Sequence, residues 1–240
     1  MLKDHPKGLL VAFFANMGER FGFYTMMAIL VLFLKAKYGM SDENAGFVYS
    51  TFYFSIYGLA LVGGFIADRI RNYKGTILAG ILTMLAGYVL MAVPGLGMYV
   101  SIGALFVIAF GNGLFKGNLQ AVVGQLYDDP RYAHKRDSAF SIFYMGINIG
   151  AFFAPSAATG IRNWTLAQHN LGYDADLPSL CHQFLSRTLE STDKFVELAT
   201  RANGAPINDL KAFAQEYIDV FGTGYHYAFG IAACAMLVSM

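Results

Sequence analysis

The sequence is poor in charge. Of its 240 residues only 14% are Asp, Glu, Lys or Arg, whereas about a quarter of a typical soluble domain is charged, and 56% are hydrophobic. The formal net charge of +1 gives no support for nucleic acid or another strongly charged partner. The two cysteines, Cys181 and Cys234, lie far apart and lack metal-ligand spacing, so we expect neither a disulfide framework nor a metal site. These shortages indicate a chain that lies in a lipid bilayer.

Long apolar runs separate the few charges. A membrane-spanning helix needs about 20 mostly apolar residues, and five runs reach or approach that length. A sixth run starts near Tyr225 and has about 16 residues at Met240, which is short of a full span. The sequence therefore predicts an all-α membrane protein with five complete spans and the start of a sixth, in which the chain stops inside a helix. The five runs cover residues 9–34, 45–67, 76–93, 98–126 and 139–161.

The short connections between the runs predict the orientation. Basic residues gather before the first run, after the second and after the fourth, whereas the short connections on the opposite side have only Lys35 and Lys37. Because Lys and Arg are enriched in cytoplasmic loops, we expect a multi-pass protein of the inner cell membrane with a cytoplasmic amino terminus. The gathered residues are Lys3, Lys7, Arg69, Arg71, Lys74, Arg131, Lys135 and Arg136.

Residues 162–222 differ from the rest because they are polar. We expect this segment outside the cytoplasm, between membrane helices in residues 1–161 and the start of the sixth membrane helix in residues 223–240. A lid, a partner contact and a simple insertion are all open as its role. Apolar residues at helical spacing predict two amphipathic helices in it, one carrying Leu177, Leu180, Phe184 and Leu185 and the other Leu210, Phe213, Tyr217 and Phe221.

Three charged residues fall inside the apolar runs. Glu19 and Arg20 lie near the middle of the first run, and Lys116 lies well inside the fourth. A charge at a helix centre costs about 2.5–3.5 kcal/mol on insertion scales, so such residues usually face a cavity or the protein interior and mark a pathway. The alternative is a Glu19–Lys116 or Glu19–Arg20 pair that only holds helices together.

Hydroxyl and amide groups on the same helices are candidates to line such a cavity. Arg20 and Tyr24 are four residues apart and share one face of the first helix. Tyr57 lies midway along the second run, and Asn148 lies four residues after Tyr144 on the fifth. Packing and hydrogen bonding between helices is the alternative interpretation for Tyr57, Tyr144 and Asn148.

The charges also indicate the kind of ligand. The planar guanidinium of Arg20 can donate two hydrogen bonds to a carboxylate, and Lys116 offers a point charge to the same group. Glu19 is a candidate proton carrier, because burial raises the pKa of a carboxyl group and a neighbouring cation lowers it.

Four motifs, in order along the chain, resemble one transporter family. Residues 16–24 read NMGERFGFY and resemble the helix-one signature of proton-dependent oligopeptide transporters, E-x-x-E-R-F-x-Y-Y. Residues 113–118, GLFKGN, are similar to the family's G-x-x-K-P-N motif, and residues 140–150, FSIFYMGINIG, resemble its helix-five signature. Residues 64–69, GFIADR, resemble the wider major facilitator loop motif. The match covers about residues 6–155 and resumes near 224–229.

The resemblance implies a major facilitator-type amino-terminal helix bundle that works by alternating access with a carboxy-terminal bundle. It implies proton-coupled uptake of di- and tripeptides, with no cofactor and no catalytic residue. By this resemblance Arg20 and Lys116 would bind the peptide carboxylate, and Glu19 would take part in proton coupling. The other implied roles are a pocket lining of Tyr24, Tyr57 and Asn148, and a cytoplasmic gate of Asp68 and Arg69.

The sequence also departs from the family pattern. Asn16 stands where the family's first Glu is usual, which removes one titratable group. Phe23 replaces the first of two tyrosines, Met27 stands where a basic residue is common, and Gly117 replaces the proline. The segment 162–222 is longer than the resemblance implies.

Other functions fit the same charges. A transporter of another small anion, such as nitrate or an amino-acid conjugate, would also use Arg20 and Lys116. A non-transporting membrane receptor is a further alternative. An intramembrane enzyme has little support, because the sequence has no obvious pair of intramembrane aspartates and no His-Glu-x-x-His pattern.

Overall fold

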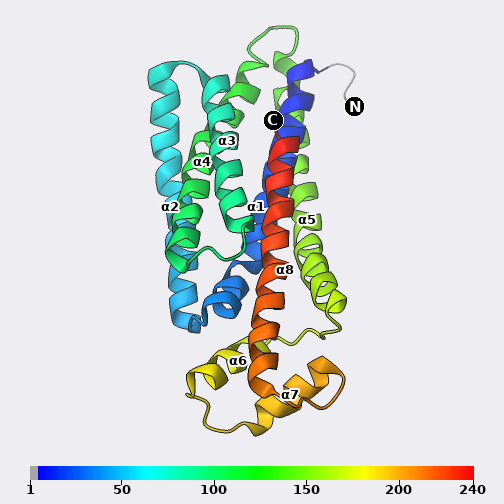
Figure 1. Cartoon of the computed structure of the whole chain (residues 1–240). Helices are drawn as coiled ribbons and strands as arrows, with labels where there is room; N and C mark the ends of the chain where they lie inside the picture. The colour runs from blue at the N-terminus through cyan, green and yellow to red at the C-terminus, as the bar shows by residue number, and fades with distance from the viewer. Residues whose placement is uncertain (1–4) are drawn as a thin grey trace.

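The computed structural model describes residues 5–240, and it is a bundle of helices without strands in that range (Figure 1). Six helical segments within residues 5–240 are long and apolar enough to cross a membrane, namely α1, α2, α3, α4, α5 together with η1, and α8. The predicted all-α membrane fold is thus confirmed, whereas Lys3, one of the orientation residues, lies outside the described range. The helices are α1 (Lys7–Tyr38), α2 (Asp42–Ile70), α3 (Tyr73–Ala92), α4 (Met98–Gln125), the 3-10 helix η1 (Ala133–Lys135), α5 (Arg136–Gln168), α6 (Leu177–Ser186), α7 (Asp193–Asn203) and α8 (Leu210–Val238).

Local sequence signals explain where the membrane helices turn. Gly39 ends α1 in the left-handed conformation at φ 63°, which a glycine adopts without strain, and its N–H donates to the carbonyl of Lys35. Ser41 then caps α2 by accepting a hydrogen bond from the Asn44 N–H at 3.3 Å. Asn72 caps α3 in the same way, through the Gly75 N–H at 3.0 Å. These short turns connect α1 to α2 and α2 to α3, and both α2 and α3 pack against α4.

Glycines allow α2, α3 and α4 to pack closely. A methyl group added at Gly63 on α2 would collide with the backbone carbonyl of Gly113 on α4, and one at Gly80 on α3 would press on the carbonyl of Gly111. Small residues at such crossings let helix backbones approach within van der Waals distance. On the other side of the bundle α1 packs against α5 and α8.

The sixth span is the main correction to the sequence prediction. α8 is one continuous helix of 29 residues from Leu210 to Val238, and not a short helix that starts near Tyr225. The second predicted amphipathic helix, which begins at Leu210, is the first part of α8. Asp209 caps it by accepting hydrogen bonds from the N–H groups of Lys211 and Ala212. No boundary falls at residue 222, because nothing in the sequence there ends the helix.

The polar segment is shorter than predicted and contains a helix that was not predicted. α5 continues to Gln168 and buries Arg162, whose guanidinium carbon lies 3.7 Å from the centroid of the Tyr173 ring. α6 corresponds to the first predicted amphipathic helix, and the unexpected α7 follows it. α6 and α7 share an apolar core in which Phe184 stacks on Phe195 at 4.8 Å.

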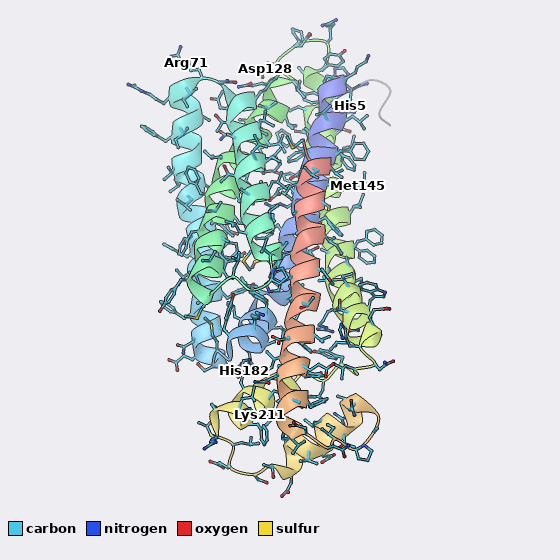
Figure 2. The ribbon with its side chains drawn as sticks, in the orientation of Figure 1. His5, Arg71, Asp128, Met145, His182 and Lys211 are labelled. Carbon is cyan, nitrogen blue, oxygen red and sulfur yellow. The ribbon has the colours of Figure 1, made fainter. Side chains whose placement is uncertain are left out.

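The two ends of the bundle differ in what they carry. Figure 2 shows Arg71, Asp128 and His5 at one end, and His182 and Lys211 at the opposite end beside α6 and α7. His182 ties α6 to the end of α1, because its Nε2 atom lies 2.8 Å from the carbonyl oxygen of Ala36. The connections after α2 and α4 are thus at the end of the bundle opposite to α6 and α7.

Candidate functional site

Glu19 and Arg20 form a buried ion pair within α1. Arg20 donates hydrogen bonds from Nε and Nη2 to the two carboxylate oxygens of Glu19, with 2.6 Å between Nη2 and Oε1. The exposed fraction is 0% for Glu19 and 6% for Arg20. Buried charges are tolerated when they are paired and hydrogen-bonded, so each of these residues compensates the other.

Asn112 on α4 adds a further donor to Glu19. Its Nδ2 atom lies 2.6 Å from Glu19 Oε1, and the residue is fully buried. This contact joins α4 to α1 at the level of the ion pair. The sequence analysis missed Asn112, although a signal was present: it is a polar residue in an apolar run, one helical turn before Lys116.

Lys116, the third charge inside the apolar runs, forms no ion pair with the residues that the structure describes. It is partly exposed on α4, and its Nζ atom lies 5.0 Å from the centroid of the Tyr57 ring. Among residues 5–240 no carboxylate lies within ion-pair distance of this ammonium group. The Glu19–Lys116 pair considered from the sequence is therefore not formed here, because Arg20 and Asn112 already occupy Glu19.

Four of the five predicted binding residues meet at one cavity of about 260 Å³. Arg20 and Tyr24 come from α1, Tyr57 from α2 and Lys116 from α4. Sequence reasoning did not select Tyr49 and Tyr53, which also line the cavity, because tyrosines are common in membrane helices. The full lining is Arg20, Phe23, Tyr24, Met27, Tyr49, Tyr53, Ile56, Tyr57 and Lys116.

The structure does not bring Asn148 into this cavity. Asn148 is exposed on α5, which packs against α1 and α8, whereas the cavity lies between α1, α2 and α4. The predicted gate residues lie at the end of α2. Asp68 accepts a hydrogen bond from the Tyr73 hydroxyl at 2.7 Å, and Arg69 is exposed. Ligand binding by Asn148 and gating by Asp68 and Arg69 stay predictions.

The geometry gives the GLFKGN motif a physical meaning. Gly113 lets α4 approach α2, and Lys116 follows three residues later on the side of the cavity. Asn118 then donates from Nδ2 to the Gly63 carbonyl at 3.2 Å and to the Leu114 carbonyl at 2.8 Å. Gly113 and Asn118 thus fix α4 against α2 on either side of Lys116.

A larger cavity, of about 400 Å³, lies elsewhere and is apolar. It is between α1, α5 and α8, and residues such as Phe21, Phe153 and Val238 line it. It has no charged side chain, so it offers nothing to a charged ligand. The smaller cavity at Lys116 is the better candidate site.

Comparison with known protein families agrees with this geometry. The model of the POT family matches residues 74–240. "Dipeptide and tripeptide permease B" of Xenorhabdus bovienii (strain SS-2004) is 37% identical over 159 residues, which are 65% of this chain and 32% of that protein. "Dipeptide and tripeptide permease A" of Cronobacter turicensis is 35% identical over 167 residues, which are 68% of this chain and 33% of that protein. The chain thus spans about a third of the length of the curated relatives it matches.

Solved structures show the same arrangement of helices. A crystal structure of a peptide transporter POT in complex with sulfate matches with a TM-score of 0.68 and 27% identity, over 100% of this chain and 37% of that one. Tetrameric PepTSo2 matches with a TM-score of 0.70 and 28% identity, over 97% of this chain and 38% of that one.

Proposed function

Because the chain belongs to the POT family, we propose that it forms the amino-terminal helix bundle of a secondary transporter, one that takes up di- and tripeptides with protons by alternating access. The names of the dipeptide and tripeptide permeases that it resembles support this class of substrate. In this proposal a carboxy-terminal bundle completes the transport path, and the protein has no catalytic role.

One observation carries the proposal: the ammonium group of Lys116 faces a cavity and has no carboxylate partner among the described residues. A partly buried cation without a partner is costly, and an anionic ligand would remove that cost. The carboxylate of a short peptide fits this requirement. The hydroxyls of Tyr24 and Tyr57 would add hydrogen bonds to the same ligand.

Arg20 would bind the peptide only by sharing its guanidinium with Glu19. Its Nε and Nη2 atoms are both occupied by the Glu19 carboxylate, which leaves Nη1 for a ligand. A peptide carboxylate that draws Arg20 away would weaken the ion pair, and a proton on Glu19 would then compensate for the lost partner. This exchange links peptide binding to proton binding at Glu19, although Asn16 stands where the family's first Glu is usual.

The proposed placement follows from the basic loops. The end of the bundle with Arg69, Arg71 and Lys74 would face the cytoplasm of an inner membrane, with α6 and α7 outside. Asp68 and Arg69 would then belong to the cytoplasmic gate. Asn148, which does not line the cavity in this structure, would reach the ligand only with the second bundle in place.

A second candidate function is transport of another small anion, because the same uncompensated cation at Lys116 would bind it. A peptide transporter POT of this fold, solved in complex with sulfate, supports testing this alternative. Nitrate and an amino-acid conjugate are the candidates to test.

Uptake by the complete gene product in proteoliposomes tests the proposal. We expect uptake of labelled Ala-Ala driven by an inward proton gradient, competition by other dipeptides and no competition by nitrate. Lys116→Gln should lower the affinity for Ala-Ala at least about tenfold, because it removes a charged hydrogen-bond donor. The control, Lys211→Gln, changes an exposed lysine at the start of α8 and should transport normally. Uptake of labelled nitrate without uptake of Ala-Ala would replace the peptide proposal with the anion alternative.

A further inference from the structure

Three tyrosines form a ladder along the cavity face of α2. Tyr49, Tyr53 and Tyr57 are four residues apart, a spacing that places side chains on one face of a helix. The rings of Tyr49 and Tyr53 are parallel within 4°, with centroids 6.3 Å apart. Tyr53 and Tyr57 meet edge to face at 5.3 Å, and their hydroxyl oxygens are 3.1 Å apart. The ladder presents a continuous aromatic wall to the cavity.

The wall runs from a charged end of the cavity to an uncharged end. At 1.5 Å per residue, Tyr49 lies roughly 12 Å from Tyr57 along α2, and Met27 lies roughly 10 Å from Arg20 along α1. Tyr49 and Met27 are thus at the end of the cavity nearer to the turn that connects α1 and α2. An extended dipeptide is about 7 Å long. A dipeptide that has its carboxylate at Lys116 and extends along this wall therefore places its amino-terminal residue beside Tyr53.

Charge decides which side chain suits this position. The residues that line the cavity include two cations and no carboxylate, since Glu19 lies behind Arg20 and is paired with it. A Lys or Arg side chain there would add a second cation beside the peptide's own amino group, and the lining residues offer neither of them an acidic partner. An aromatic side chain would instead stack on Tyr53 and contact the thioether of Met27, both of which are favourable.

We propose that Tyr53, together with Tyr49 and Met27, forms a subsite that selects ligands with an aromatic side chain on the amino-terminal residue and disfavours a cationic one there. This inference rests on the proposed function, because it takes the ligand to be a short peptide anchored by its carboxylate. It goes beyond that function by naming the side chain and the residues that select it.

Competition against labelled Ala-Ala uptake by the complete gene product in proteoliposomes tests the subsite. In the wild type we expect Phe-Ala to compete about tenfold better than Lys-Ala, and better than Ala-Phe, in which the ring is on the wrong residue. Tyr53→Ala should lower the ratio of Phe-Ala to Ala-Ala affinity about fivefold to tenfold, and Tyr53→Phe should keep it, because the ring makes the contact. Tyr99→Ala is the matched control, since Tyr99 lies on α4 outside the cavity with 82% of its surface exposed.

A gain-of-function variant covers the case in which Tyr53→Ala fails to fold. Met27→Glu adds a carboxylate at the uncharged end of the cavity, so Lys-Ala should compete better relative to Phe-Ala. Equal competition by Phe-Ala and Lys-Ala in the wild type would overturn the subsite and leave peptide transport standing. An unchanged Lys-Ala to Phe-Ala ratio in a folded Met27→Glu protein would do the same. Absence of saturable Ala-Ala uptake by the folded protein would instead overturn the proposed function and the subsite together.

Discussion

Lys116 and Arg20 are both cations inside an apolar bundle, but their surroundings differ. Arg20 is buried and held by Glu19, whereas Lys116 is partly exposed, lies near the Tyr57 ring and has no ion pair among residues 5–240. Removal of one partner from a buried ion pair leaves an uncompensated charge, and removal of an unpaired cation does not. The two residues should therefore respond differently to neutralisation.

Neutralising Arg20 should destabilise the protein, and neutralising Glu19 as well should restore part of the loss. We expect Arg20→Gln to cost about 3–5 kcal/mol because it strands the buried Glu19 carboxylate, and the Glu19→Gln/Arg20→Gln double variant to cost less. Thermal unfolding of the purified chain in detergent measures the order of stability. Lys116→Gln is the control and should keep or raise the wild-type midpoint, because it removes a cation that has no ion pair. A double variant less stable than Arg20→Gln would contradict the assignment of the pair as mutually compensating.

The sequence revealed the charged residues of the site better than the uncharged ones. Glu19, Arg20 and Lys116 stood out because an ionisable residue in an apolar run needs an explanation. Asn112 and Tyr53 did not stand out, since their contacts depend on the positions of α4 and α2 relative to α1, which the sequence does not show. Asn148 was selected by a motif, and the motif does not show which way a side chain on α5 faces in a single bundle.

At the scale of elements, the crossing of α2 and α4 positions Lys116. Gly63 and Gly113 meet at this crossing, and the adjacent Gly64 faces open space. The two neighbouring glycines of α2 thus have the same helix propensity, but Gly63 is tightly packed and Gly64 has no neighbour in contact. This contrast separates the effect of packing from the effect of propensity.

Gly63→Ala should destabilise the protein, and Gly64→Ala should not. The added methyl group at Gly63 would meet the Gly113 backbone, which cannot move like a flexible side chain, and overpacking of this kind typically costs about 1–3 kcal/mol. At Gly64 the same change meets no neighbouring atom and favours the helix by roughly 1 kcal/mol. Thermal unfolding of both variants measures the difference. A similar midpoint for the two would show that α2 and α4 are not in close contact.

Hydropathy located the membrane helices and failed at their polar extensions. It finds the residues that lie in hydrocarbon, but a helix continues as long as its backbone hydrogen bonds do, so α8 begins at Leu210 although the apolar run starts later. The helix that was not predicted, α7, has four charged residues among its 11, namely Asp193, Lys194, Glu197 and Arg201. These charges make the segment polar on average, so its apolar stripe was not recognised.

At the scale of the whole molecule, the bundle separates two kinds of surface. The end with Arg71 and Asp128 carries the basic connections, and the opposite end carries α6 and α7 with Lys211 (Figure 2). The structure fixes that these groups lie at opposite ends. The excess of Lys and Arg around Arg71 predicts which end faces the cytoplasm.

Labelling of single cysteines tests this orientation. In a Cys181→Ala/Cys234→Ala background, Lys211→Cys should react with a membrane-impermeant maleimide added to intact cells, because Lys211 is exposed beside α6 and α7. Arg71→Cys should react only after the membrane is permeabilised, because its exposed position lies at the basic end. Labelling of both positions in unfolded protein controls for thiol reactivity. The reverse pattern would place the basic end outside, and Asp68 and Arg69 would then lie on the wrong side of the membrane for a cytoplasmic gate.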